Sequence, residues 1–310
     1  MARVILITQG LSAVVRPLVN SGHHIVGIVE SAPRERPSIL EQCIDEIITR
    51  ILGKSNLRDF AFRSGIPYFY MEKGSGIKLS EWIRARSPDI IAIYSMSQLL
   101  PRGVFCIPPL GTINLHPSLL PKYRGPNPWF WTYYFMDLEP GVTIHYIDEG
   151  EDTGDIIYQE SFSIDKGIPL EDLRQTAERI GVRLLLKAIN DIEVGRAPRI
   201  TQPKNSPTPR ARNVDPYEEL IDWSWPIERV WHVLRGTEAW LRPYKPDIPW
   251  VKWRVLDYKR CDSTQYVPGC LYSNRGRWFV ACTEGVIYLR KIVDLKVVAK
   301  HLISRWGYFV

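Results

Sequence analysis

Two polar residues that could do chemistry stand close together in the stretch Gly111–Asp155. Asn114 and His116 are two residues apart in the apolar run Thr-Ile-Asn-Leu-His, so an extended strand would point both side chains to one face. An amide and an imidazole on one face can donate hydrogen bonds to a developing negative charge and accept a proton. The alternative is a satisfied core histidine and an asparagine in a turn, because histidine is also common in structural roles.

A carboxylate follows in the same stretch. Asp152 stands in the turn Asp148–Asp155, after a segment that alternates as a strand, Gly141–Ile147. The strand predicted at Thr112–His116 ends at Pro117, because proline breaks strand pairing. The three polar residues therefore lie among apolar residues and residues that shape the backbone.

Short apolar runs upstream indicate a parallel sheet. Residues 3–8 and 24–29 flank a helical stretch at 11–20, which is the pattern of a β-α-β unit. The first turn offers only Gln9-Gly10 where a dinucleotide site needs G-x-G-x-x-G, so such a site is not supported. We expect an α/β fold with a Rossmann-like, mostly parallel sheet and flanking helices. Further strands are expected at 65–70, 89–94 and 156–163, and helices at 39–52, 79–86 and 170–190.

The loop Ser95–Pro101 follows the buried run Asp89–Tyr94. In open α/β sheets, ligands bind outside the carboxyl ends of the strands. The loop is therefore a candidate wall of a binding site.

The last third of the chain has a different pattern. Residues 201–216 are polar, contain four prolines and predict a linker. Short strand-like runs follow a helical segment at 227–234 and suggest a smaller, OB-like β-barrel. We expect a catalytic domain at 1–200, the linker at 201–216 and the barrel domain at 217–310. The strand-like runs are 251–258, 270–273, 278–282 and 286–292.

Composition narrows the class of protein. A hydrophobic content of 45% and a charged content of 24% are typical of a soluble globular protein. No apolar run approaches a membrane span and no signal peptide is visible, so the cytoplasm is the expected compartment. The five cysteines are scattered without C-x-x-C spacing, which argues against a zinc site or a disulfide framework. We therefore expect no metal and no membrane partner.

Charge is distributed unevenly. Residues 1–204 hold 23 basic and 23 acidic residues, whereas 205–310 hold 17 and 11, so the second part carries the whole net charge of +6. A basic terminal module suggests an anionic partner, either nucleic acid or a phosphate-bearing small molecule. An ordinary solvated basic surface explains the charge equally well.

The long motif Asn114-Leu-His-Pro-Ser-Leu-Leu-Pro-Lys-Tyr-Arg-Gly125, with Gly-Val-Thr-Ile and Asp152-Thr-Gly-Asp after it, resembles the 10-formyltetrahydrofolate-dependent formyltransferases. The first strands, Ile221–Ser224 and the ending Ser304–Val310 look like further parts of that family. This coverage points to the branch with methionyl-tRNA formyltransferase and the formyltransferase half of the bifunctional aminoarabinose enzyme.

The resemblance implies a reaction and a catalytic trio. The formyl donor would be N10-formyltetrahydrofolate, and the trio would be Asn114, His116 and Asp152. Formyl transfer to an amine builds negative charge on the carbonyl oxygen, for which Asn114 and His116 are suitable donors. The amine must lose a proton, and Asp152 would orient His116 and assist that transfer.

The resemblance also implies a donor-binding wall. The loop Ser95–Leu99 matches the family's pterin-binding loop, where backbone groups pair with the ring, and the turn Ile147–Glu151 would form the opposite wall. The candidate donor-binding residues are Met96, Gln98, Leu99, Ile147, Asp148 and Glu149.

Two departures bear on the amine acceptor. Members that act on tRNA carry a Gly- and Lys-rich basic insertion after the second strand, whereas Ser31–Leu57 here mixes basic with acidic residues. After Gly125 the chain has Pro126–Trp131, rich in aromatics where the tRNA enzymes have small residues. Such aromatics suit a nucleotide base or an amino-sugar ring, or they are core packing of a helix.

Three functions are compatible with these patterns. The first is transfer of the formyl group to the primary amine of a nucleotide-linked amino sugar, and the second is transfer to methionyl-tRNA, which the basic C-terminal region favours. The third is a non-catalytic nucleic-acid-binding protein on the same scaffold, which has no physical reason to keep the trio. A homodimer interface or a core would explain the six tryptophans Trp223, Trp225, Trp231, Trp240, Trp250 and Trp253.

Overall fold

The computed structural model describes residues 1–33, 56–215, 218–237, 251–293 and 297–298. The helix expected at 39–52, the charged region after the second strand and the ending Ser304–Val310 lie outside these ranges. Within the described residues, no helix combines the length and the apolar character that a membrane crossing requires.

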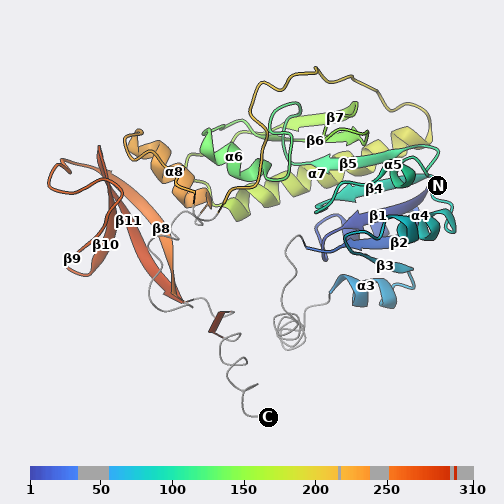
Figure 1. Ribbon diagram of the computed structural model, residues 1–310, viewed down its shortest axis with the longest axis horizontal. Helices are drawn as coiled ribbons and strands as arrows, with labels where there is room; N and C mark the ends of the chain where they lie inside the picture. The colour runs from blue at the N-terminus through green and yellow to red at the C-terminus, as the bar shows by residue number, and fades with distance from the viewer. Residues whose placement is uncertain (34–55, 216–217, 238–250, 294–296, 299–310) are drawn as a thin grey trace, which may run out of the picture.

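The first part of the chain forms one large sheet, as the sequence predicts. Seven strands lie in the order β3-β2-β1-β4-β5-β6-β7, in which β3 to β5 are mutually parallel and the last two strands are antiparallel (Figure 1). The strands are β1 (Arg3–Thr8), β2 (His24–Ser31), β3 (Tyr68–Met71), β4 (Ile90–Tyr94), β5 (Thr112–His116), β6 (Gly141–Tyr146) and β7 (Ile156–Ser161).

Helices cover both faces of this sheet because its strands are apolar on both sides. One face packs against α1, α3 and the long α7, and the other against α4 and α5. The helices are α1 (Val15–Val19), α3 (Leu57–Arg63), α4 (Gly76–Arg84), α5 (Arg102–Phe105), α6 (Pro128–Tyr134), α7 (Leu170–Glu193) and α8 (Ile227–Thr237).

The packing of strand β5 determines the direction of the Asn114 and His116 side chains. Ile113 and Leu115 belong to the core under α7, so the alternate residues Asn114 and His116 face the opposite side of the sheet. The contact between α7 and β5 is close at Gly181, where an added Cβ would lie 2.7 Å from Leu115 Cδ1. The apolar face of β5 is thereby fixed, and with it the direction of both polar side chains.

The C-terminal part forms a separate antiparallel sheet. Four strands lie in the order β8-β11-β10-β9, and the sheet buries a second core against α8. Four of the six tryptophans (Trp223, Trp225, Trp231 and Trp253) belong to this core or pack against it, and the other two lie outside the described residues. This architecture is consistent with a small barrel-like domain. The strands are β8 (Val251–Arg260), β9 (Leu271–Asn274), β10 (Arg277–Cys282) and β11 (Gly285–Val293).

A buried histidine joins the two parts where α6 meets α8. His232 is fully buried, its Nδ1 accepts a hydrogen bond from the Gly167 N–H at 2.8 Å, and its ring lies 4.9 Å from that of Tyr133. Its Nε2 has no hydrogen-bond partner among the described residues. Burial, and secondarily the nearby charge of Lys166, lowers the pKa of His232 to about 4.

We therefore expect stability to fall on acidification. His232 is neutral in the fold, whereas the unfolded chain binds its proton near pH 6.5. The stabilisation is fully present above that pH and is lost progressively as pH falls toward 4. The full shift corresponds to ~3 kcal/mol, of which about 2 kcal/mol should be lost between pH 7.5 and pH 5, as measured by urea unfolding at the two pH values.

The matched control is His232→Gln, which can still accept the hydrogen bond from Gly167 but does not titrate. The variant should lose most of the difference in unfolding free energy between the two pH values. An equal pH dependence in both proteins would contradict this role of His232.

Candidate active site

A cavity opens at the carboxyl ends of β4 and β5, where ligands bind in open α/β sheets. Its volume is about 700 Å³, within the range of small-molecule sites. All nine residues singled out from the sequence line this one cavity: Asn114, His116, Asp152, Met96, Gln98, Leu99, Ile147, Asp148 and Glu149.

Asn114 is held by a residue that sequence reasoning missed. The register of β5 and β6 places Asn114 opposite His145, and Asn114 Nδ2 lies 3.1 Å from His145 Nε2. His145 Nδ1 donates to the Tyr146 carbonyl at 2.8 Å, so Nε2 of the neutral ring accepts from the amide. One of the two N–H donors of Asn114 remains for a ligand in the cavity.

His116 is buried, and its ring is fixed by a main-chain carbonyl. His116 Nε2 lies 3.1 Å from the Tyr123 carbonyl, so Nε2 carries the proton of the neutral ring. Nδ1 is then the basic nitrogen, and it lies 3.5 Å from Asp152 Oδ2. The Tyr123 carbonyl thus fixes the ring from one side, a contact that the sequence did not predict, and Asp152 lies on the other side.

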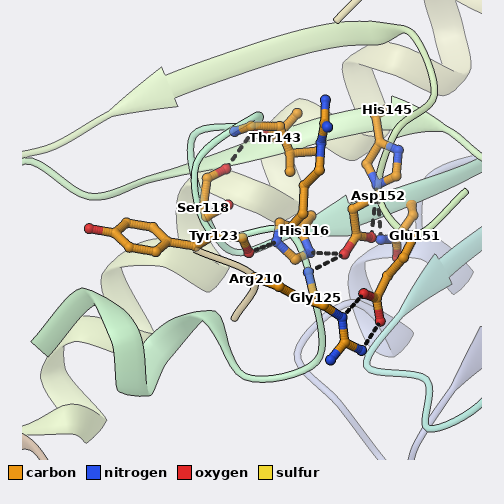
Figure 2. A network of polar contacts seen from close by, with 12 residues as sticks. His116, Ser118, Tyr123, Gly125, Thr143, His145, Glu151, Asp152 and Arg210 are labelled. Atoms are coloured by element: carbon orange, nitrogen blue, oxygen red, sulfur yellow. Dashed lines mark hydrogen bonds and ion pairs between the residues drawn. The ribbon is translucent and has the colours of Figure 1, made fainter. Parts of the chain in front are cut away.

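Asp152 lies between two imidazole rings (Figure 2). Its Oδ2 accepts a hydrogen bond from the Gly125 N–H at 2.9 Å, and its Oδ1 lies 3.6 Å from His145 Nε2. The backbone at Asp152 is left-handed, with φ of 56°. Gly125 must be glycine here, because its φ is 123° and an added Cβ would meet the Ala211 carbonyl at 2.9 Å.

The surroundings of His116 and Asp152 determine which of the two side chains is charged at neutral pH. Burial lowers the pKa of His116 below its ordinary value and outweighs the opposite effect of Asp152. Burial raises the pKa of Asp152, but the surrounding polar groups, among them the Gly125 N–H that donates to Oδ2, lower it overall. At neutral pH the site thus holds a neutral imidazole beside a carboxylate, which suits it to collect a proton.

One wall of the cavity is the loop after β4. Met96 packs partly against the core under α4 and α5, whereas Leu99 leaves 72% of its surface exposed at the rim. Gln98 Nε2 lies 3.4 Å from the Met71 carbonyl. The loop thus offers apolar surface and backbone groups, which fit a planar heterocycle such as a pterin.

The facing wall is the turn after β6. Ile147 packs against the same core as Met96. Asp148 Oδ1 accepts from the Gly150 N–H at 3.0 Å and from Thr153 Oγ1 at 2.7 Å, so this carboxylate stabilises the turn itself. Glu149 pairs with Arg102 of α5 at the surface.

The aromatic segment after Gly125 divides between core and cavity. Phe130 and Trp131 are buried in a cluster with Tyr123 and Ala211, as the core-packing alternative predicts. Trp129 packs partly against the cores under α7 and also lines the cavity.

Residues of the predicted linker also reach the site. Arg210 lines the cavity and forms a two-point ion pair with Glu151, with Nη2 2.7 Å from Oε1 (Figure 2). Arg174 of α7 lines the cavity as well.

Within the described residues, no group of three or more His, Cys, Asp or Glu side chains is arranged to hold a metal ion.

Comparison with known proteins agrees with this geometry. A family model described as formyl transferase matches residues 61–189. The methionyl-tRNA formyltransferase of Clostridioides difficile is 33% identical over 245 residues, which cover 78% of each chain.

Solved structures resemble the chain over nearly its whole length. The sugar 3N-formyltransferase WlaRD, solved with dTDP and 5-N-formyltetrahydrofolate, aligns with a TM-score of 0.63 at 18% identity over 94% of this chain and 98% of that one. An N-formyltransferase from Helicobacter canadensis, in complex with folinic acid and dTDP-3-aminofucose, aligns with a TM-score of 0.61 at 18% identity over 94% and 100%. At this identity the likeness concerns the fold.

The chain belongs to the 10-formyltetrahydrofolate-dependent formyltransferase family. It is a tetrahydrofolate-dependent formyl transfer enzyme, so the non-catalytic alternative is not retained.

Proposed function

We propose that the enzyme moves the formyl group of N10-formyltetrahydrofolate to the primary amine of a nucleotide-linked amino sugar. The observation that carries this proposal is Trp129, which lines the same cavity as Asn114 and His116. An indole at that place suits a sugar ring or a nucleotide base. Arg174 and Arg210 on the same cavity lining suit the phosphates of such an acceptor.

The catalytic roles follow from the polar contacts. Asn114 donates its remaining N–H to the carbonyl oxygen as that oxygen gains negative charge. His116 Nδ1 collects the proton that the attacking amine loses, and the Asp152 carboxylate stabilises the resulting imidazolium. His145 holds Asn114 in place. Once the amine has added to the formyl carbon, the bond from that carbon to N10 of the donor breaks, and the proton held on His116 would pass to N10, so that tetrahydrofolate leaves.

The donor is proposed to lie between the two walls described above. Met96 and Ile147 would contact its ring, and backbone groups near Gln98, Leu99, Asp148 and Glu149 would pair with its polar edge. The proposed domains are 1–200 for catalysis, 201–216 as the linker and 217–310 as the C-terminal, OB-like domain.

Methionyl-tRNA is the second candidate acceptor. The excess of basic residues after residue 204 favours it, and so does the name of the curated relative at 33% identity. An activity assay distinguishes the two acceptors. The enzyme is given N10-formyltetrahydrofolate together with a dTDP- or UDP-linked amino sugar in one reaction and with charged initiator tRNA in another. We expect turnover with a nucleotide sugar; formylation of tRNA alone would overturn the first choice.

Trp129→Ala should weaken acceptor binding in particular. Loss of the ring is expected to raise the KM for the nucleotide sugar by about tenfold, since an aromatic contact is worth ~1 kcal/mol beyond its buried area. The KM for the folate donor should change far less, because its proposed walls lie elsewhere. Steady-state kinetics with each substrate varied in turn measures both values.

The matched variant is Trp129→Phe, which keeps an aromatic ring at the wall and should stay near wild type. Equal increases in both KM values in Trp129→Ala would assign Trp129 to packing and remove the argument for a planar acceptor.

A further inference from the structure

The segment after α7 is part of the site's framework. Figure 1 shows this segment arching over the β6–β7 side of the large sheet on its way to α8. It starts with a two-way backbone pairing of Ile200 with Ile156, at 2.8 and 2.9 Å. Further along, Ala211 donates to the Arg124 carbonyl at 2.7 Å and accepts from the Asn127 N–H at 2.9 Å. The proline-rich segment is thus anchored on the start of β7, just after the Asp152 turn, and on the loop that carries Gly125.

Gln202 is the side chain that ties these loops together. Only 8% of its surface is exposed. Its Nε2 donates to the Gly154 carbonyl at 2.7 Å and to the Asp152 carbonyl at 3.1 Å. Its Oε1 accepts from Arg124 Nη2 at 2.8 Å and from Arg124 Nε at 3.2 Å. Both donors and both acceptor positions of the amide are therefore satisfied.

The bonds of Gln202 converge on the backbone that carries Asp152. They hold the peptide carbonyls on either side of Thr153, while the residue after Arg124, Gly125, holds the Asp152 carboxylate. Asp152 itself has the left-handed φ of 56°, a conformation that costs free energy for any residue with a Cβ. A turn of this kind keeps its shape only where surrounding contacts fix it.

We propose that Gln202 is a positioning residue for formyl transfer, which acts by fixing the Asp152 turn so that its carboxylate faces His116 and His145. The proposal rests on the catalytic role proposed above for Asp152. A side-chain amide suits the position because it donates to two carbonyls and accepts from a guanidinium at once. A glutamate of the same length would keep the contact with Arg124 but lose both donors, and it would place negative charge against two carbonyl oxygens.

The test compares single and double variants with the full-length enzyme and the acceptor that it turns over. Gln202→Ala is expected to lower kcat by ~10²-fold with a small change in the KM for the donor, because a displacement of about 1 Å at a catalytic group has that effect. If the alanine variant fails to fold, Gln202→Glu replaces it in the test. The glutamate keeps the volume of the side chain and should show the same loss of kcat.

Two controls separate positioning from general stability. Gln159→Ala removes an amide that is more exposed than Gln202 but also donates twice, to the Leu120 carbonyl at 2.7 Å and to Thr143 Oγ1 at 2.9 Å, and that does not contact Asp152. It should keep near-normal kcat. In an Asp152→Asn background, Gln202→Ala should cause little further loss, because the group that it positions is already disabled.

The outcomes are distinguishable. The same ~10²-fold loss in the Asp152→Asn background, or normal kcat in the single variants, overturns the positioning role alone. Full activity of Asp152→Asn overturns the proposed role of Asp152, and the inference about Gln202 with it. Both roles are supported if kcat falls in each single variant and if adding Gln202→Ala to Asp152→Asn causes no further fall.

Discussion

Replacing His116 by alanine is expected to reduce formyl transfer by at least ~10³-fold. The amine cannot complete its attack without losing a proton, and Nδ1 of this neutral, buried ring is the proposed base. The measurement is kcat and kcat/KM for formylation of the acceptor at saturating donor. Near-normal turnover would remove the proposed mechanism.

The controls for His116 address folding and pH. His24→Ala changes an exposed histidine at the start of β2 and should leave the rate unchanged. Because burial lowers the pKa of His116, the neutral ring persists below the ordinary imidazole pKa of about 6.5. The acidic limb of kcat/KM should therefore lie below pH 6.5, and it should be absent from the residual activity of His116→Ala.

Asp152→Asn is expected to lower kcat by ~10²- to 10⁴-fold while the protein stays folded. The amide keeps the size of the side chain and the contact with the Gly125 N–H, so the turn is retained. The negative charge that stabilises a protonated His116 is lost. Single-turnover rates with bound donor measure this chemical step directly.

Asp155→Asn is the matched control because it alters a carboxylate of the same turn. Asp155 faces Arg199, with Oδ2 and Nη1 3.7 Å apart, and it does not contact either imidazole ring. A small decrease in rate for Asp155→Asn beside a large decrease for Asp152→Asn would show that the reaction needs the negative charge at Asp152. Equal effects at both positions would instead indicate damage to the turn.

Much of the fold could be predicted because its signals are local. The apolar runs match the parallel strands of the large sheet, since buried parallel strands are apolar on both faces. The common face of Asn114 and His116 follows from the two-residue period of a strand. Closure of the C-terminal sheet into a barrel stays a prediction.

The parts of the site that were missed depend on long-range geometry. His145 reaches Asn114 only because of the register between β5 and β6, which no local pattern specifies. The Tyr123 carbonyl meets His116 through a left-handed backbone at a non-glycine residue, with φ of 56°. Gln202 lay in a stretch whose prolines and polarity predict a linker, and the same composition gives no sign of the partners that the segment binds.

The pairing of Ala211 with the loop that carries Gly125 sets an order of events during synthesis. The proposed catalytic residues His116, Asn114 and Asp152 are all translated before α7, yet two backbone hydrogen bonds of this loop involve Ala211, which lies beyond that helix. A chain emerging from the ribosome therefore has every reactive group before it has the geometry that makes them reactive. The formyl donor would meet a finished site only after the connecting segment has folded back, a long-range closure of the kind that forms late.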